Sequence, residues 1–163
     1  MTPATYSNFA DNTMALRPYA TTVSAQALTI DDKSKFDPQC RLAAPIQASG
    51  DRTPAQFVLD AFNDELKFAG VFGQSDTSRK IRLTLDKARF SSMAGLTRGW
   101  WEFGLTLANE SNGVTYSVSD HYKFQSGFDA MTACKQTAEA MTPAVQHLIY
   151  QAVSSPEFAK LMK

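Results

Sequence analysis

Three consecutive segments between residues 80 and 124 alternate apolar and polar side chains, and no other feature constrains the fold as strongly. The segments are 80–90 (KIRLTLDKARF), 99–109 (GWWEFGLTLAN) and 114–124 (VTYSVSDHYKF). A period of two residues is typical of β-strands with one buried and one solvated face. Asn112-Gly113 provides the positive φ angles of a tight hairpin between the last two segments. The pattern therefore predicts an antiparallel meander.

The alternation also assigns the side chains to two faces. The inner face is predicted to hold Leu83, Leu85, Trp101, Phe103, Leu105, Tyr116 and Val118. The outer face is predicted to hold Arg82, Thr84, Glu102, Thr106, Thr115, Ser117, Ser119 and His121. Ala88 and Phe90 fall on the opposite parity from Leu85, so we expect a bulge or bend near Asp86–Lys87.

Trp100 and Trp101 are neighbours in the second strand, so one of them has to leave the core face. Trp100 is that residue by parity. It either covers a sheet edge or lies under the N-terminal arm, or it is an exposed aromatic anchor for a partner.

Helical patterns flank this meander. Residues 54–69 carry an apolar stripe at helical spacing, begin with the capping box Thr53-x-x-Gln56 and end at Gly70. A second helical pattern runs from Gly127 to about residue 153, and Pro143 predicts either a kink or a division into two helices.

Residues 21–32 complete the pattern as a further strand, which gives the order β-α-β-β-β-α. We therefore predict an α+β two-layer sandwich, in which an antiparallel sheet of about four strands has two helices on one face. Residues 1–20 lack a clean period and are interpreted as an extended arm or tether. Residues 21–163 are interpreted as a single domain.

Composition excludes some classes of function. The chain has 163 residues and equal numbers of acidic and basic side chains, 16 of each, which gives no reason to expect nucleic-acid binding. No apolar run approaches the roughly 18–20 residues of a bilayer span. There is also no basic and apolar leader, so Met1 is either a native start or an initiator on a chain whose secretion signal is gone.

The two cysteines bear on the compartment. Cys40 lies in a loop, and Cys134 lies on the apolar side of the second helix. Zinc needs about four ligands at characteristic spacing, and His121 and His147 are distant in sequence, so no metal site is predicted. A thiol on an apolar stripe stays protonated, which argues against a nucleophile. Two alternatives remain: free thiols in a cytosolic domain, or a Cys40–Cys134 disulfide, which we favour and which persists in a periplasm or an exterior.

Motifs for catalysis are weak. Asp120 and His121 are adjacent in a strand and point to opposite faces, so they form no direct dyad. The stretch GVFGQSD (70–76) has two glycines but not the pattern of a phosphate-binding loop. No catalytic residue and no cofactor is predicted.

Four segments together resemble a known group: FVLDAFNDELKFAGVF, IRLTLDKARFSSM, WWEFGLTLANESNGVTYSVSDHYKF and ACKQTAEAMTPAVQHLIYQAVSSPEF. They are similar to small bacterial outer-membrane lipoproteins of the YajG type and to the auxiliary lipoproteins of envelope transport systems, over roughly residues 20–162. The resemblance implies an α/β sandwich without enzymatic activity and with no catalytic residues. Such proteins carry a lipidated cysteine at the mature N-terminus, whereas this chain begins with Met1.

Two functional hypotheses follow, of different classes. The first is a non-enzymatic, periplasm-facing lipoprotein domain, anchored to the outer membrane in its native form, that binds or positions an unknown envelope protein or assembly. Its partner-binding candidates are Arg82, Trp100, Glu102 and His121. Membrane contact is expected only through an N-terminal lipid anchor that this chain lacks.

The second hypothesis is a small ligand-binding or enzymatic α+β domain with a pocket between helices and sheet. The many bulky aromatic side chains on the inner face favour a filled core instead. A homodimer formed through a sheet edge or the last helix is a further alternative.

Overall fold

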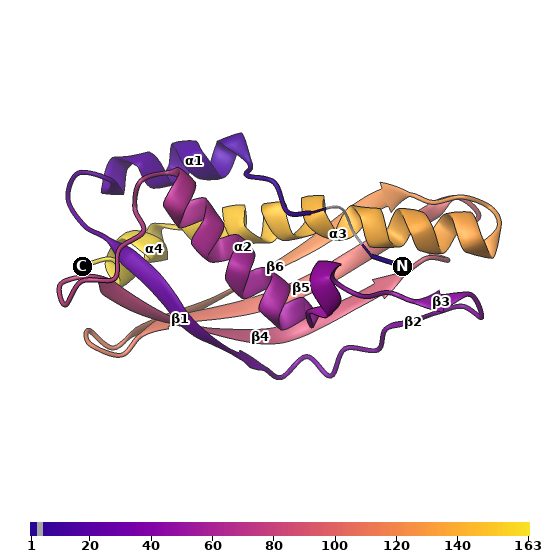
Figure 1. Cartoon of the computed structure of the whole chain (residues 1–163), viewed down its shortest axis with the longest axis horizontal. Helices are drawn as coiled ribbons and strands as arrows, with labels where there is room; N and C mark the ends of the chain where they lie inside the picture. The colour runs from indigo at the N-terminus through magenta and orange to yellow at the C-terminus, as the bar shows by residue number, and fades with distance from the viewer. Residues whose placement is uncertain (3–4) are drawn as a thin grey trace.

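The computed structural model describes residues 1–2 and 5–163. Figure 1 shows an elongated molecule in which helices lie along one side of a twisted sheet. The helices are α1 (Ala10–Leu16), α2 (Pro54–Phe68), α3 (Ala130–Val153) and α4 (Pro156–Leu161), with the 3-10 turns η1 (Arg17–Tyr19) and η2 (Ser49–Asp51). The strands are β1 (Ala25–Asp32), β2 (Gln39–Cys40), β3 (Ala44–Pro45), β4 (Arg79–Ser91), β5 (Arg98–Asn109) and β6 (Val114–Gln125).

The main sheet has four strands in the order β1-β4-β5-β6. Strands β4, β5 and β6 are antiparallel neighbours, as the alternation predicts. Strand β1 is parallel to β4, so the sheet is mixed and the expectation of an antiparallel sheet is wrong at this edge. The reason is α2, which carries the chain back across the sheet between β1 and β4, and such a crossover joins parallel strands. The predicted α+β two-layer architecture is confirmed.

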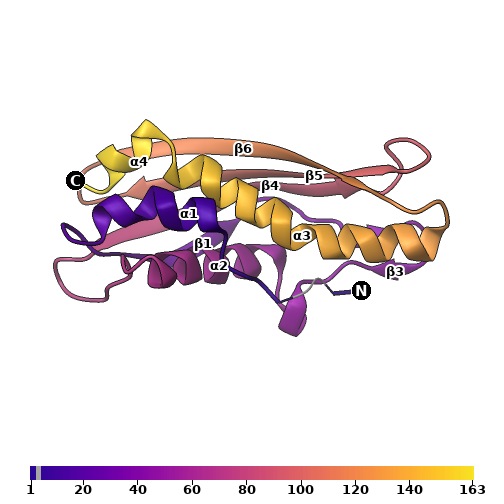
Figure 2. The same cartoon turned by 90° about the horizontal axis from the view of Figure 1, so that it is seen from above.

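The core lies between the sheet and its helices. Figures 1 and 2 show α1, α2 and α3 on the same side of the sheet. The predicted inner residues Leu83, Leu85, Trp101, Phe103 and Leu105 are all buried, and Tyr116 and Val118 are half-buried. The Trp101 indole N–H donates to the Thr137 carbonyl at 2.8 Å, so this large ring is both packed and hydrogen-bonded.

A register shift in β4 determines which cations reach the outer face. The pairing of β4 with β5 shifts between Leu85 and Lys87, which confirms the predicted bulge. After the shift, Lys87 pairs with Gly104 and Arg89 pairs with Glu102, which lies on the outer face. A bulge of this kind re-aims side chains, and here it turns Lys87 and Arg89 away from the core.

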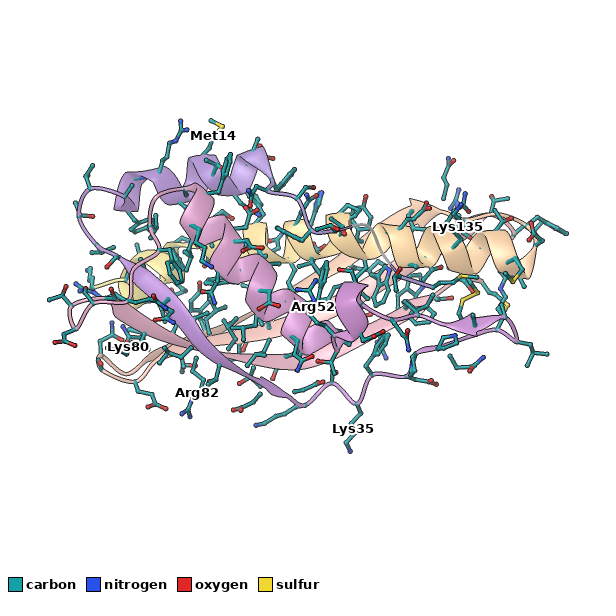
Figure 3. The ribbon with its side chains drawn as sticks, in the orientation of Figure 1. Met14, Lys35, Arg52, Lys80, Arg82 and Lys135 are labelled. Atoms are coloured by element: carbon teal, nitrogen blue, oxygen red, sulfur yellow. A yellow bond between two sulfur atoms is a disulfide. The ribbon has the colours of Figure 1, made fainter. Side chains whose placement is uncertain are left out.

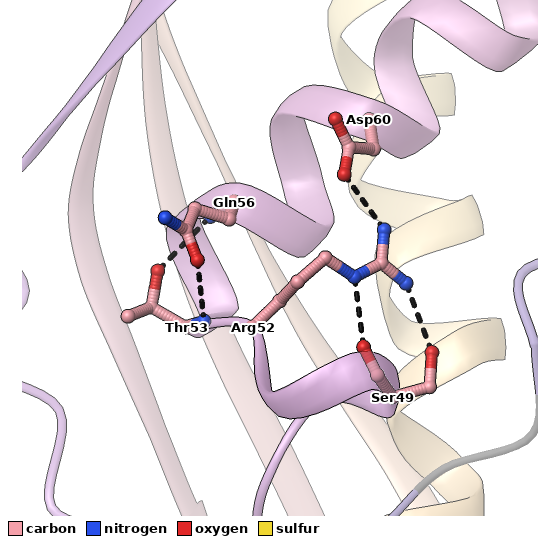
Figure 4. A network of polar contacts seen from close by, with 5 residues as sticks. All are labelled: Ser49, Arg52, Thr53, Gln56 and Asp60. Carbon is pink, nitrogen blue, oxygen red and sulfur yellow. Dashed lines mark hydrogen bonds and ion pairs between the residues drawn. The ribbon is translucent and has the colours of Figure 1, made fainter.

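Helix α2 begins where the sequence predicts. Thr53 Oγ1 accepts a hydrogen bond from the Gln56 N–H at 3.2 Å, and Gln56 Oε1 accepts one from the Thr53 N–H at 3.0 Å (Figure 4). Arg52 adds a second set of contacts, donating to the Ser49 carbonyl at 2.8 Å and to Asp60 Oδ2 at 2.7 Å. The reciprocal contacts of Thr53 and Gln56 thus satisfy two backbone N–H groups at the helix start that have no partner within the helix.

The first twenty residues differ from the expected extended arm. Residues 10–19 form α1 and η1, and Leu16 is fully buried. Asn12 Nδ2 donates to the Gln146 carbonyl at 3.1 Å, which holds α1 against α3. A helix of seven residues is too short to display a clear period, and its position depends on long-range contacts. Residues 3–4 of the predicted arm lie outside the described residues.

Helix α3 continues through Pro143, so the alternative of two separate helices is wrong. Its residues Met141, Val145 and Leu148 are buried against the sheet on both sides of the proline. A proline in a helix interior costs about 3 kcal/mol, and this apolar burial offsets the cost.

Candidate functional site

The two cysteines form the predicted disulfide. Cys40 in β2 and Cys134 in α3 are joined with an Sγ–Sγ distance of 2.05 Å and a Cα–Cα distance of 5.9 Å. Both residues are buried. The bond closes a loop between residues 94 positions apart, for which the chain-entropy model gives about 4–5 kcal/mol of stabilisation.

Three of the four partner-binding candidates meet on the outer face. Glu102 pairs with His121 of β6 and with Arg89 of β4, and Trp100 lies two residues before Glu102 on the same strand. The rings of Trp100 and His121 are 5.1 Å apart between centroids. We call Lys87, Arg89, Trp100, Glu102 and His121 the outer-face cluster.

Glu102 is the acidic centre of this cluster. Its carboxylate accepts hydrogen bonds from Lys87 Nζ at 2.8 Å and from Arg89 Nη2 at 3.0 Å. His121 Nδ1 lies 3.6 Å from its other oxygen. The hydrogen bond from Lys87, followed by the contact with Arg89, lowers the pKa of Glu102 below its ordinary value. The side chain is therefore held ionised and in one place.

Trp100 is half-buried. The Arg89 guanidinium lies 6.0 Å from its ring centroid, at the outer limit of a cation–π contact. The ring is thus supported on the outer face by Arg89 and His121, and it is not packed into the core as Trp101 is.

Two shallow hollows border the outer-face cluster. One, of about 430 Å³, is lined by Arg98, Trp100, Lys123 and Phe124 with three smaller neighbours. The other, of about 400 Å³, is lined by Lys87, Glu102, Ser119, Asp120, His121 and Gln151. Cations therefore predominate around Trp100. Lys87 and Arg89 balance the charge of Glu102, and Arg98 and Lys123 lie beside the Trp100 ring. Such a surface suits an acidic group with an apolar neighbour.

Arg82 does not belong to this cluster. It pairs with Ala108, six positions along β5 from Glu102, which corresponds to about 20 Å of strand. Its Nη1 forms an ion pair with Glu110 Oε1 at 2.9 Å (Arg82 is labelled in Figure 3). The prediction that Arg82 lies on the exposed side is therefore correct. Its grouping with Trp100, Glu102 and His121 as a binding candidate is not matched by its position, which is far from theirs along the sheet.

Asp120 and His121 point to opposite sides of β6. His121 joins the outer-face cluster, whereas Asp120 is half-buried and lies near His147. Burial raises the pKa of Asp120, partly opposed by the nearby His147 and His121. Both residues border the same hollow at the β6 edge of the sheet, but neighbours in a strand point to opposite faces and so form no direct pair.

Sequence reasoning missed Lys87, Arg89, Arg98 and Lys123 as members of this surface. The parity change at Asp86–Lys87 contained the signal for Lys87 and Arg89, because a bulge places the residues after it on the opposite face. Lys123 shares the parity of His121 within the alternating segment 114–124, so the alternation also contained its signal, whereas Arg98 lies just before the segment 99–109, where alternation carries little information.

No protein-family model and no curated protein matches the chain. Among solved structures, the chain is similar to a protein of the DUF330 family from Xanthomonas campestris, with 12% identity, a TM-score of 0.48 and coverage of 85% of this chain and 95% of that chain. It is also similar to an uncharacterised protein, with 9% identity, a TM-score of 0.47 and coverage of 80% and 93%. A candidate lipoprotein of Caulobacter crescentus gives 11% identity, a TM-score of 0.36 and coverage of 88% and 98%. Likenesses of this size carry no argument about function, and the YajG-type resemblance stays a prediction.

Residues 1–2 and 5–163 contain neither a membrane-spanning helix nor a group of side chains suited to a metal ion. No helix in this part of the chain is both long and apolar enough to cross a membrane. No group of three or more histidine, cysteine or acidic side chains there is arranged to hold a metal ion.

Proposed function

We propose that this chain is a non-enzymatic binding domain of a periplasm-facing lipoprotein, which binds or positions a protein component of the bacterial envelope. The observation that carries the proposal is the Cys40–Cys134 disulfide. Disulfides form and persist in oxidising compartments and are rare where thiols are kept reduced. A compartment outside the cytoplasm accounts for a bond that joins two distant parts of the chain.

The outer-face cluster supports the binding role. Tryptophan and arginine are the residues most enriched at the energetic centres of protein interfaces, and Trp100 and Arg89 lie side by side on an open sheet face. Lys87, Arg98 and Lys123 surround them. The partner is therefore expected to present acidic side chains next to an apolar one.

Photo-crosslinking in the native bacterium tests the binding surface. A photoreactive amino acid at Ser119 or Lys123, both exposed on the outer face, should give a discrete adduct. The same group at Lys67, exposed on α2, is the control and should give none. Trp100→Ala or Arg89→Glu should reduce the outer-face adduct at least fivefold, whereas Thr115→Ala should not.

Two results contradict this assignment. Adducts that form equally from Lys67 and Ser119 would show that contact is not specific to the outer face. An outer-face adduct that survives both Trp100→Ala and Arg89→Glu in folded protein would remove the outer-face cluster from the interface.

A further inference from the structure

Large apolar side chains are exposed together at one end of the molecule. Five of the nine exposed large apolar residues in the described part of the chain belong to three neighbouring segments there: Leu42 (100%), Leu96 (77%), Phe128 (74%), Met93 (67%) and Met131 (60%). The segments are residues 40–44, which form the turn of the β2–β3 hairpin with one strand residue on each side, residues 92–97 between β4 and β5, and residues 126–131, which run from the end of β6 into the first turn of α3. We call them the loop end.

The three segments are fixed to one another. Arg41 donates to the Ser92 carbonyl at 2.8 Å and to Ser92 Oγ at 3.1 Å. The Ser126 hydroxyl donates to the same Ser92 carbonyl at 3.2 Å, and the Ser126 N–H donates to the Thr97 carbonyl at 3.0 Å. The disulfide joins Cys40 to α3 at the same place. Figures 1 and 2 agree in placing these segments at one end of the long axis.

The charge of the loop end is mainly positive. Arg41, Arg98 and Lys135 lie in or next to the three segments, and Lys135 is labelled near the start of α3 in Figure 3. Two acidic residues lie equally near: Asp37, whose carboxylate accepts from the Gln39 N–H at 3.0 Å, and Asp129, the N-cap of α3, whose carboxylate accepts from the Thr132 N–H at 3.0 Å. Apolar tips surrounded by cations are the composition of a surface that binds an anionic lipid interface.

We propose that the loop end docks on the surface of a lipid bilayer that contains anionic headgroups. Leu42, Leu96 and Phe128 enter the boundary between headgroups and acyl chains, and Arg98 and Lys135 contact the phosphates. The apolar side chains project from separate loops and do not line a groove, which suits a fluid apolar phase better than a preformed protein ligand.

The start of the described chain lies beside this end. The Met1 amino group donates to the Pro45 carbonyl at 2.9 Å, and the Gln47 N–H donates to the Met1 carbonyl at 2.9 Å. A lipid anchor preceding this point would bring the loop end toward the same bilayer. That orientation rests on the proposed function, whereas the lipid contact itself does not.

Vesicle flotation of the full chain tests the proposal. Vesicles of phosphatidylethanolamine with phosphatidylglycerol should carry the protein, and vesicles of phosphatidylcholine alone should carry at least several-fold less. Leu96→Ser with Phe128→Ser should lower the bound fraction at least about tenfold, because each buried apolar side chain contributes strongly to partitioning. Arg98→Gln with Lys135→Gln should remove the preference for anionic lipid.

The matched control is Met14→Ser with Phe68→Ser, which changes two side chains of similar exposure, 70% and 63%, on helices α1 and α2. It should bind as the unchanged chain does. A second measurement avoids dependence on serine variants: an environment-sensitive dye on Leu96→Cys should brighten with anionic vesicles, and the dye on Phe68→Cys should not. Both native cysteines are already paired in the disulfide, so the new thiol is the one that is labelled.

Three results overturn the proposal. One is absence of flotation and of dye brightening for the unchanged chain with anionic vesicles. Another is equal loss of binding in the loop-end and control variants. The third is self-association or protein binding that needs Leu96 and Phe128 while vesicles have no effect, which would make this end a protein interface. None of these assays involves the envelope partner, so they fail or succeed independently of the outer-face cluster.

Discussion

At the scale of single residues, Glu65 links the first residues of the chain to α2. It is buried, and its Oε1 accepts hydrogen bonds from the Tyr6 hydroxyl at 3.1 Å and from the Phe9 N–H at 3.0 Å. Its Oε2 and the nearby Asn12 Oδ1 are buried without a hydrogen-bond partner. Burial raises the pKa of Glu65, and the contacts with Phe9, Tyr6 and Asn12 only partly oppose this.

Glu65→Gln should therefore reduce the pH dependence of stability. The folded protein holds the Glu65 proton more tightly than the unfolded chain does, so protonation of Glu65 stabilises the fold. This contribution is complete below the ordinary glutamate pKa of 4.5 and is lost as pH rises through the raised pKa of the folded protein. Glutamine keeps an oxygen that accepts from the Tyr6 hydroxyl and the Phe9 N–H, and it places no charge in this buried position. Its unfolding free energy should exceed that of the unchanged chain by about 1 kcal/mol at mildly alkaline pH, and by less near pH 4.

Urea unfolding at the two pH values measures this difference. Glu139→Gln, an exposed change on α3, is the control and should leave the pH dependence as it is. An advantage of Glu65→Gln that is the same at both pH values would contradict ionisation of Glu65 as its cause.

At the scale of the elements, the start of α2 depends on a reciprocal pair of side-chain contacts between Thr53 and Gln56 (Figure 4). Thr53→Ala removes the acceptor of the Gln56 N–H and should lower the unfolding free energy by about 1 kcal/mol. Thr53→Ser keeps the hydroxyl and should stay within a few tenths of a kcal/mol of the unchanged chain. Equal unfolding midpoints for the two variants in urea would show that the cap does not stabilise α2.

Elements with strong local signals were predictable from the sequence. The alternation located β4, β5 and β6, the capping box located α2, and the parity change located the bulge in β4. These signals arise from contacts within an element or between hairpin neighbours, so they are present in the local sequence.

The remaining elements depend on contacts made across the molecule. Helix α1 is held by Asn12 and Leu16 against distant segments, and α3 passes Pro143 because the sheet packs against it on both sides of the proline. The parallel placement of β1 follows from the path of α2. The candidate site was predicted only in part. The alternation placed Trp100, Glu102 and His121 on one face, but their meeting across strands, and the distance of Arg82 from them, depend on the strand register.

At the scale of the whole molecule, two surfaces have separate proposed roles. The outer-face cluster offers an aromatic and cationic surface to a protein partner, and the loop end offers apolar tips to a bilayer. The long sheet edge formed by β6 is a third surface, which would have a role in the alternative of a homodimer formed through a sheet edge. Native mass spectrometry of the full chain distinguishes a monomer from that dimer.

The disulfide is central to the whole account, because it connects β2 to α3 and carries the proposal of an oxidising compartment. The most direct measurement is the thiol content of the protein purified from its native host without reductant and alkylated under denaturing conditions. Mass spectrometry should find neither Cys40 nor Cys134 alkylated before reduction and both alkylated after it. Two cysteines that are fully alkylated before any reduction would contradict the disulfide and, with it, the assignment to an oxidising envelope compartment.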